Sequence, residues 1–281
     1  MKARLRTDKP TPARMYDYYL GGKDNFEVDR AAVESINPKA RDTLRNAAWE
    51  NRRFLWRAVD YLVRERGITQ FIDVGSGLPT VRSTHEVAQD VNPGARVVYV
   101  DNDPIVLSHG QALLAKDGNT AIVEADLRDP SAILAAPEAE ALVDFTKPVA
   151  VLLVAVLHFI TAPGHPRHVP GDTAPGEIVT AFRDRVAPGS CLVISHATLD
   201  GADTDLVSGM EELYGGATSP LIFRSREEIE KLFTGWQLLP PGVARPWQWP
   251  AKDSASPRGR YMLAGVAVKD HDEPARSTPG V

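Results

Sequence analysis

The spacing of hydrophobic residues changes near residue 67, from the period of helices to an alternation of short strands and helices. Within 49–66 the apolar residues fall on one helical face and the charges on the other, and Gly67 follows as a C-terminal cap. Thr11-Pro12 and Asn37-Pro38 are typical of helix starts, because proline at the first helical position loses no hydrogen bond. We therefore expect helices over 13–20, 41–48 and 49–66.

Beyond residue 67, short apolar runs alternate with helical patterns, which indicates a parallel sheet covered by helices. The run 149–154 is apolar throughout and favours a strand that is buried on both faces. The sequence thus predicts an α/β, Rossmann-like fold with a seven-stranded, mostly parallel sheet, an antiparallel last strand and helices on both faces. The predicted strands are 70–74, 96–100, 120–124, 149–154, 191–195, 236–239 and 261–268.

Length and composition indicate one main domain with an appendage. The 281 residues are 43% hydrophobic and 25% charged, which is close to the average of globular proteins. We expect residues 1–66 to form a helical lid on a ligand-binding core of residues 67–270, with 271–281 as a flexible tail. Two loops, 161–177 and 240–257, are rich in proline, and loops of this length are often functional.

Charge and cysteine content narrow the expected partners and compartment. The net charge of −5 gives no basic surplus, so we do not expect a nucleic-acid partner. The longest apolar run, 149–160, is too short to cross a bilayer as a helix, so we expect no membrane partner. Cys191 is the only cysteine, which is compatible with a reducing compartment. We expect a cytoplasmic protein, and the sequence leaves monomer and homodimer open.

A glycine-rich turn follows the first predicted strand, in Phe71-Ile-Asp-Val-Gly-Ser-Gly77. An acid at the strand end followed by Gly-x-Gly lets the backbone approach a ligand closely at the carboxyl edge of the sheet. Asp101 ends the next strand, where a carboxylate can accept hydrogen bonds from both hydroxyls of a ribose. These residues predict a nucleoside site.

The remaining positions distinguish between nucleoside cofactors. Thr80 stands where a dinucleotide fingerprint has its third glycine, which argues against a diphosphate. Asp126 and Leu127 follow the third strand, where they are suited to an adenine amino group and ring. The best candidate is S-adenosylmethionine, with S-adenosylhomocysteine as product. The predicted core contacts are Asp73, Gly75, Ser76, Gly77, Asp101, Asn102, Asp126, Leu127 and Ala155.

The front of the chain carries the most specific resemblance. The segment Ala13-Arg-Met-Tyr-Asp-Tyr-Tyr-Leu-Gly-Gly-Lys-Asp-Asn-Phe26, supported by 51–57 and 100–104, resembles the actinobacterial S-adenosyl methyltransferase family, formerly a domain of unknown function. The resemblance implies a class I methyltransferase sheet with N-terminal helices over the cofactor, and no particular acceptor. In such a lid we expect Tyr18, Gly22 and Asn25 to contact the cofactor; alternatively, the tyrosines only pack the helix onto the sheet.

The acceptor chemistry is predicted from the residues after the fourth and fifth strands. Many N-methyltransferases carry Asn/Asp-Pro-Pro-aromatic there, whereas this chain has Ala155-Val-Leu-His-Phe159. We therefore expect methyl transfer to a small-molecule acceptor, at oxygen rather than nitrogen. His158 is the first candidate for the catalytic base and His196 the second, although a histidine at a strand end is often structural.

Other readings stay open from the sequence. The chain lacks a substrate motif, so a non-catalytic S-adenosylmethionine sensor or accessory protein is the main alternative, followed by a protein or nucleic-acid methyltransferase and a nicotinamide-dependent dehydrogenase. The histidines at 165 and 168 lie in a proline-rich loop without a carboxylate or thiolate pattern, and we expect no metal. Trp247 and Trp249 are candidates for lining an acceptor pocket.

Overall fold

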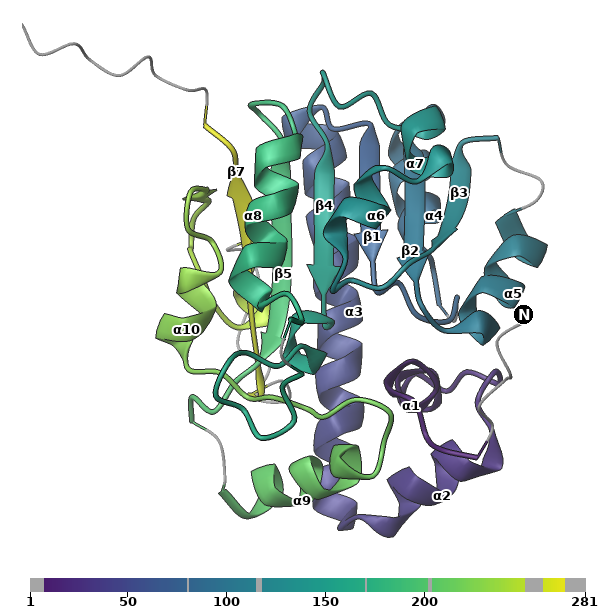
Figure 1. Ribbon diagram of the computed structural model, residues 1–281, viewed down its shortest axis with the longest axis vertical. Helices are drawn as coiled ribbons and strands as arrows, with labels where there is room; N and C mark the ends of the chain where they lie inside the picture. The colour runs from purple at the N-terminus through teal and green to yellow at the C-terminus, as the bar shows by residue number, and fades with distance from the viewer. Residues whose placement is uncertain are drawn as a thin grey trace, which may run out of the picture.

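One sheet runs through the centre of the molecule (Figure 1). The computed structural model describes residues 8–79, 81–114, 118–169, 171–201, 204–250 and 260–270. Its strands are β1 (Gln70–Val74), β2 (Arg96–Asp101), β3 (Thr120–Glu124), β4 (Ala150–Val154), β5 (Cys191–Ala197), β6 (Gln237–Leu238) and β7 (Met262–Val268), in the order β3-β2-β1-β4-β5-β7-β6. The strand β7 runs antiparallel to both neighbours, and the other pairs are parallel. The predicted fold class is confirmed.

The helices surround this sheet and extend beyond one of its edges. The observed helices differ from the predicted ones at four places: the two helices expected over 41–66 are one, and α2, α7 and α9 were not expected. The bounds are α1 (Pro12–Tyr19), α2 (Glu27–Ser35), α3 (Pro38–Arg66), α4 (Thr84–Val91), α5 (Pro104–Leu114), α6 (Pro130–Leu134), α7 (Pro137–Leu142), α8 (Pro175–Arg185), α9 (Thr204–Gly215) and α10 (Arg226–Lys231), with 3₁₀ turns η1 (Leu157–Phe159) and η2 (Pro246–Gln248).

The two faces of the sheet carry separate hydrophobic layers. On one face, side chains of α6, α8 and α10 such as Ile133, Phe182 and Ile229 are fully buried against the strands. On the other face, α3 and α4 contribute Phe54, Leu62 and other apolar residues. Strand β4 is buried on both sides, as its unbroken apolar run predicts. Packing on both faces therefore fixes the position of the sheet, and with it the position of the carboxyl ends of its strands.

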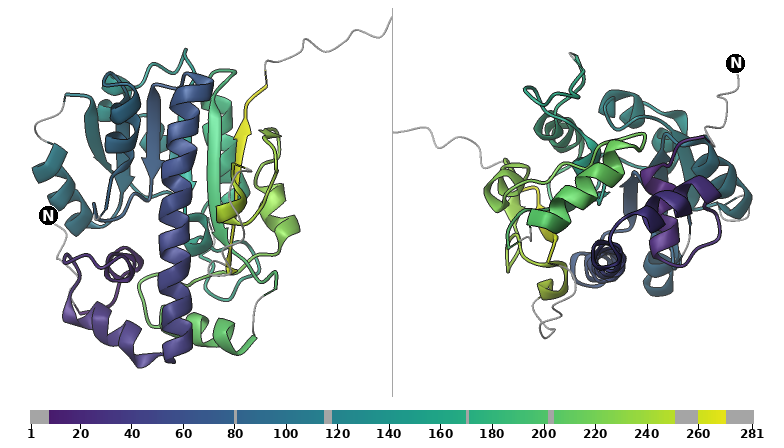
Figure 2. Two further views of the ribbon diagram at one scale, coloured as in Figure 1. Left: turned by 180° about the vertical axis from the view of Figure 1, so that it is seen from behind. Right: turned by 90° about the horizontal axis from the view of Figure 1, so that it is seen from below.

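A third hydrophobic cluster lies beyond the carboxyl ends of the strands. It joins α1, α2, the first half of α3 and α9 through residues such as Met15, Val33, Ala47 and Met210. Figure 2 shows α3 continuing past the strand ends beside α1 and α2, so one helix belongs to both the sheet and this layer. We call the layer of α1, α2, the first half of α3 and α9 the cap. The cap covers the carboxyl ends of the strands, where ligands bind in this architecture.

A buried ion pair holds the first two helices of the cap together. The Nε atom of Arg14 donates to the Asp29 carboxylate at 2.7 Å, and their side chains are 1% and 0% exposed. The same carboxylate accepts the backbone N–H groups of Thr11 and Phe26 at 3.0 and 2.9 Å. Asp29 thereby satisfies donors at the starts of both α1 and α2, which explains why a short helix with little apolar surface is stable here.

No helix in the described ranges is both long and apolar enough to cross a membrane. The part of the loop 240–257 that the structure describes packs on the back of α3, where Arg57 donates to the carbonyls of Pro246 and Trp249. Trp249 itself is 1% exposed and lies edge-on to Phe54 and Tyr61. It is a core residue, so the prediction that it lines an acceptor pocket is wrong. The predicted tail, 271–281, lies outside the described residues.

Candidate active site

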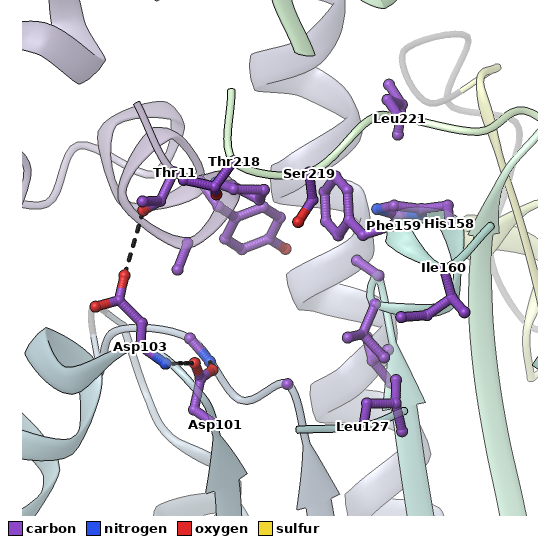
Figure 3. Close-up of a pocket in the computed structure, with 18 of the residues that line it drawn as sticks. Thr11, Asp101, Asp103, Leu127, His158, Phe159, Ile160, Thr218, Ser219 and Leu221 are labelled. Carbon is purple, nitrogen blue, oxygen red and sulfur yellow. Dashed lines mark hydrogen bonds between the residues drawn. The ribbon is translucent and has the colours of Figure 1, made fainter. Parts of the chain in front are cut away.

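A cavity of about 730 Å³ lies between the carboxyl ends of the strands and the cap (Figure 3). Such a volume is ordinary for a small-molecule site, which typically measures about 300–1,000 Å³. Strand register brings the ends together, since Val74 pairs with Val100 and Val154 with Ser195. The floor of the cavity is therefore built from the residues that directly follow β1, β2, β3 and β4.

The turn after β1 brings bare backbone to the cavity. Gly75 has φ +69°, and a Cβ placed there would lie 2.3 Å from Val156 Cγ2. Gly77 also has a positive φ, of +66°, so both positions need a residue without a side chain. Gly75, Ser76 and Gly77 all line the cavity, as expected from the Gly-x-Gly pattern. Thr80 lies outside the described residues.

Asp101 presents a poised carboxylate at the end of β2. One oxygen accepts the Gly77 N–H and the other the Asp103 N–H, each at 2.9 Å. Burial raises the pKa of Asp101 to about 6, against the lowering effect of these two N–H groups. Each oxygen keeps capacity for a further hydrogen bond toward the cavity, so the geometry fits a pair of ribose hydroxyls.

The two neighbouring acids differ from Asp101 in how far they are already engaged. Asp73 lines the cavity, and its carboxylate accepts a hydrogen bond from Thr84 Oγ1 at 2.6 Å, while burial raises its pKa. Asp126 also lines the cavity, but its two oxygens accept four hydrogen bonds from Arg128 and Asn102. Burial acts to raise the pKa of Asp126, and these bonds, led by Arg128, bring it to about 2.

The saturation of Asp126 limits what it can offer to an adenine. Each of its oxygens already receives two donors, at distances between 2.6 and 3.0 Å. An amino group of a base has no open lone pair there unless Arg128 or Asn102 moves. Leu127, by contrast, is 6% exposed and presents an apolar side chain to the cavity.

The cap turns different residues toward the cavity from those expected. Tyr18, Gly22 and Asn25 do not line it: the Tyr18 hydroxyl donates to Glu34, and Asn25 donates to Asp17 and the Gly22 carbonyl. The front of the cap, α1 and the residue before it, lines the cavity with Thr11, Pro12, Ala13, Arg14, Tyr16 and Tyr19. The first half of α3 adds Leu44, Ala47, Ala48, Asn51 and Arg52, and α9 adds Met210 and Tyr214. This is a correction to the predicted lid contacts, because Tyr16 and Tyr19 lie three residues apart on one helical face and Tyr18 lies on another.

A buried chain of hydrogen bonds connects the cap to the end of β4. Asn51 Nδ2 donates to the Tyr16 hydroxyl at 2.9 Å, and Asn51 Oδ1 accepts from Ser195 Oγ at 2.5 Å. Ser195 Oγ in turn accepts the Ala155 N–H at 2.9 Å. Ala155 has a left-handed backbone with φ +56° and lines the cavity. Asn51 and Ser195 were not predicted as site residues. Their hydrogen bonds hold the left-handed turn at Ala155, the residue that the sequence did predict as a contact.

His158 lies at the end of the cavity away from Asp101, beside Phe159 (Figure 3). Its Nδ1 accepts the Ala197 N–H at 3.2 Å, which leaves the proton of the neutral ring on Nε2. Burial, together with the charge of Arg224, lowers the pKa of His158 to about 3. The side chain is therefore a neutral hydrogen-bond donor at physiological pH rather than the proton acceptor expected from the sequence.

His196 does not line the cavity, contrary to the prediction. It is 0% exposed, its Nε2 accepts from Arg224 at 2.6 Å, and its Nδ1 is 2.7 Å from the Ala197 carbonyl, to which it donates. Burial lowers the pKa of His196 well below its usual value. Both ring nitrogens are engaged, so His196 is a structural residue that helps to hold Arg224.

Aromatic and aliphatic side chains surround the His158 end of the cavity. The Phe159 ring lies 4.4 Å from the His158 ring and 5.6 Å from that of Tyr214 on α9. Figure 3 shows Ile160, Ser219 and Leu221 around the same end. The loop 161–177 takes part as well, since Thr161, Arg167, Val169 and Asp172 line the cavity. In the described residues no group of three or more His, Cys, Asp or Glu is arranged to hold a metal ion.

A mostly parallel seven-stranded sheet with an antiparallel β7, a Gly-x-Gly turn after β1 and a buried acid at the end of β2 defines a nucleoside-binding domain of the methyltransferase class. The sequence profile of the S-adenosyl methyltransferase family matches residues 1–270, and the chain belongs to this family. It is an S-adenosylmethionine-dependent methyltransferase. That assignment separates it from the sensor and dehydrogenase alternatives.

Two solved structures support the same membership. A protein of Thermobifida fusca YX, named as a candidate methyltransferase, is 42% identical, with a TM-score of 0.82 over 95% of this chain and 97% of that one. A DUF574 family protein of Streptomyces avermitilis MA-4680 is 38% identical, with a TM-score of 0.85 over 95% of this chain and 100% of that one. No curated protein matches the chain.

Proposed function

We propose that this methyltransferase methylates an oxygen atom of a small, largely apolar acceptor whose hydroxyl or carboxyl group ionises readily. The single observation that carries this proposal is the neutral His158 donor set among aromatic walls. Donation from Nε2 stabilises an oxyanion, whereas a neutral amine nucleophile needs its lone pair free and gains nothing from such a donor. Phenols, enols and carboxylic acids fit this chemistry.

The donor site is proposed to be the Asp101 side of the cavity. Asp101 would accept the ribose hydroxyls, the backbone of Gly75 to Gly77 would pass close to the methionyl chain, and Leu127 would cover the adenine. Ser76, Asn102 and Ala155 complete the proposed contacts, and Asp126 would bind only through a rearranged Arg128. S-adenosylmethionine supplies an electrophilic methyl group, and its sulfur keeps the electron pair of the broken bond.

The protein's own contribution is then positioning and exclusion of water. Figure 3 places His158, Phe159 and Ser219 across the cavity from Asp101, with the cap above. The acceptor would enter as an oxyanion, since the pKa of His158 is about 3 and its neighbours Phe159, Ile160 and Leu221 cannot accept a proton. His158 would hold that oxygen by one hydrogen bond while the aromatic rings orient the body of the acceptor. The oxygen forms the new bond to carbon, and no proton transfer is required in that step.

The acceptor class can be tested with a panel of small compounds. Purified protein and S-adenosylmethionine are incubated with phenols, enolisable diketones, aromatic carboxylic acids and matched aromatic amines, and release of S-adenosylhomocysteine is measured. Turnover is expected with the acidic oxygen compounds. Turnover only with the amines would contradict oxygen methylation while leaving the family assignment intact.

Replacing His158 separates the donor from the base role. For His158→Gln we expect kcat to fall about 10- to 100-fold, the size of one lost hydrogen bond to a charged group, with S-adenosylhomocysteine affinity unchanged. For the wild type, kcat should show no inflection near pH 6.5, because the pKa of His158 is about 3. An inflection near that pH which His158→Gln removes would establish a base instead.

A further inference from the structure

Arg52 is a buried cation without an ion-pair partner in the described part of the chain. It lies on α3, lines the cavity, and is 8% exposed. Its Nε atom is buried and has no hydrogen-bond partner. Its guanidinium lies 5.6 Å from the centre of the Tyr16 ring. Leaving a buried donor unsatisfied is costly, and such a group at a cavity wall points to an anionic ligand.

The other arginines that line the cavity differ in this respect. Arg14 is paired with Asp29, and Arg128 with Asp126 and Asp172. Arg167 is exposed and donates to the Gly215 carbonyl at 3.4 Å. Arg52 is close enough to Asp73 for its charge to lower the pKa of that carboxyl, but no salt bridge joins the two. Asp73 is instead bonded to Thr84. The Arg52 side chain is hydrogen-bonded to the Tyr16 hydroxyl, and its Nε–H stays without a partner. A planar guanidinium with an open donor suits a carboxylate best.

The position of Arg52 favours one anion over others. Asp73, which the charge of Arg52 reaches, is the fourth residue of β1, with Val74 between it and the Gly75 to Gly77 turn. Strand β1 lies between β2, which ends at Asp101, and β4, which Ala155 follows. A donor whose ribose lies on Asp101 and whose sulfur faces the His158 end must pass its amino-acid chain over β1. We propose that Arg52 binds the α-carboxylate of the methyl donor, with Tyr16 holding the guanidinium in place. This inference rests on the proposed donor site.

The experiment compares two ligands that differ only in the amino-acid chain. S-adenosylhomocysteine carries the carboxylate, whereas 5′-methylthioadenosine has the same adenosine and a thioether but no carboxylate. Both affinities are measured by calorimetry on the wild type, Arg52→Gln, Arg52→Lys and Asp101→Asn. Arg53→Gln is the matched control, because Arg53 neighbours Arg52, is 52% exposed, pairs with Glu50 and does not line the cavity.

We expect Arg52→Gln to weaken S-adenosylhomocysteine by about 10- to 100-fold, the size of one charge-assisted hydrogen bond or slightly more, and methylthioadenosine by less than about twofold. The affinity of Arg52→Lys for S-adenosylhomocysteine should lie between those of the wild type and Arg52→Gln, since lysine keeps the positive charge but loses the paired donors of the guanidinium. Arg53→Gln should change neither affinity. The preference of the wild type for S-adenosylhomocysteine should shrink in Arg52→Gln.

Two outcomes overturn the assignment of Arg52. Either S-adenosylhomocysteine binds Arg52→Gln as it binds the wild type, or both ligands weaken equally, which indicates a structural role. Failure of the donor site itself gives a different result, because Asp101→Asn would then leave both affinities intact. If Arg52→Gln does not fold, equal affinities of the two ligands for the wild type overturn the proposal without any variant.

Discussion

Replacing Asp101 by asparagine is expected to weaken S-adenosylhomocysteine by about 100-fold or more, because two hydrogen bonds from ribose to a buried carboxylate are lost or reduced. The asparagine also brings an amide N–H₂ toward the Gly77 or Asp103 N–H, where the carboxylate accepts at 2.9 Å. Calorimetry measures the loss. Asp126→Asn is the comparison variant, and its effect should be smaller because the Asp126 oxygens are already occupied.

The same residue makes donor binding depend on pH. Since the pKa of Asp101 is raised to about 6, the carboxylate is ionised above that pH and protonated below it. Ligands that need the ionised form should bind less tightly as pH falls below 6, by at most about tenfold per pH unit. The stability of the free protein depends on pH in the opposite direction. Because the pKa of Asp101 is higher in the folded chain than in the unfolded one, the free energy of unfolding rises as pH falls from about 6 toward the pKa of the unfolded chain. Asp101→Asn should bind with no such pH dependence.

Breaking the buried pair of the cap is expected to have the largest effect on stability. Asp29→Ala leaves the Arg14 guanidinium, 1% exposed, without its carboxylate and also orphans the N–H groups of Thr11 and Phe26. Removing one partner of a buried ion pair typically costs about 3–5 kcal/mol. Urea denaturation measures the loss in the free energy of unfolding. We also expect weaker ligand binding, because α1 supplies Thr11, Tyr16 and Tyr19 to the cavity.

A surface pair provides the control for this prediction. Arg64 and Asp60 form an ion pair one turn apart on α3, with side chains 55% and 47% exposed. Asp60→Ala should change the free energy of unfolding by less than about 1 kcal/mol. The double variant Arg14→Met with Asp29→Leu should regain only part of the lost stability, since no charge remains buried but the N–H groups of Thr11 and Phe26 still lack an acceptor. An Asp29→Ala protein as stable as Asp60→Ala would contradict the role given to the pair.

The sheet and the donor end of the cavity were predictable because each depends on local pattern. Apolar strands followed by acids or glycines report the carboxyl ends of parallel strands, and these ends meet at one edge whatever the long-range contacts are. Gly75, Gly77 and Asp101 were found in this way. Helix α9 also left a signal that was missed, since Leu206, Val207, Met210, Leu213 and Tyr214 recur at helical spacing.

The local sequence could not predict the roles of the two histidines, nor which side of the cap faces the cavity. The protonation of His158 depends on an N–H from Ala197, and that of His196 on Arg224, so partners distant in sequence decide the chemistry. Tyr18 was chosen over Tyr16 and Tyr19 because the sequence does not say which side of α1 meets the sheet. The charge on Arg52 was visible, but its lack of a partner is a property of the folded chain alone.

The continuous helix α3 also restricts how ligands reach the cavity. Its 29 residues form a rod of about 43 Å, anchored in the sheet at one end and in the cap at the other. The wall of the cavity that α3 forms is thus rigid, because it can move only if the helix bends. Ligands are therefore expected to enter from the other sides, where the loop 161–177 and α9 border the cavity.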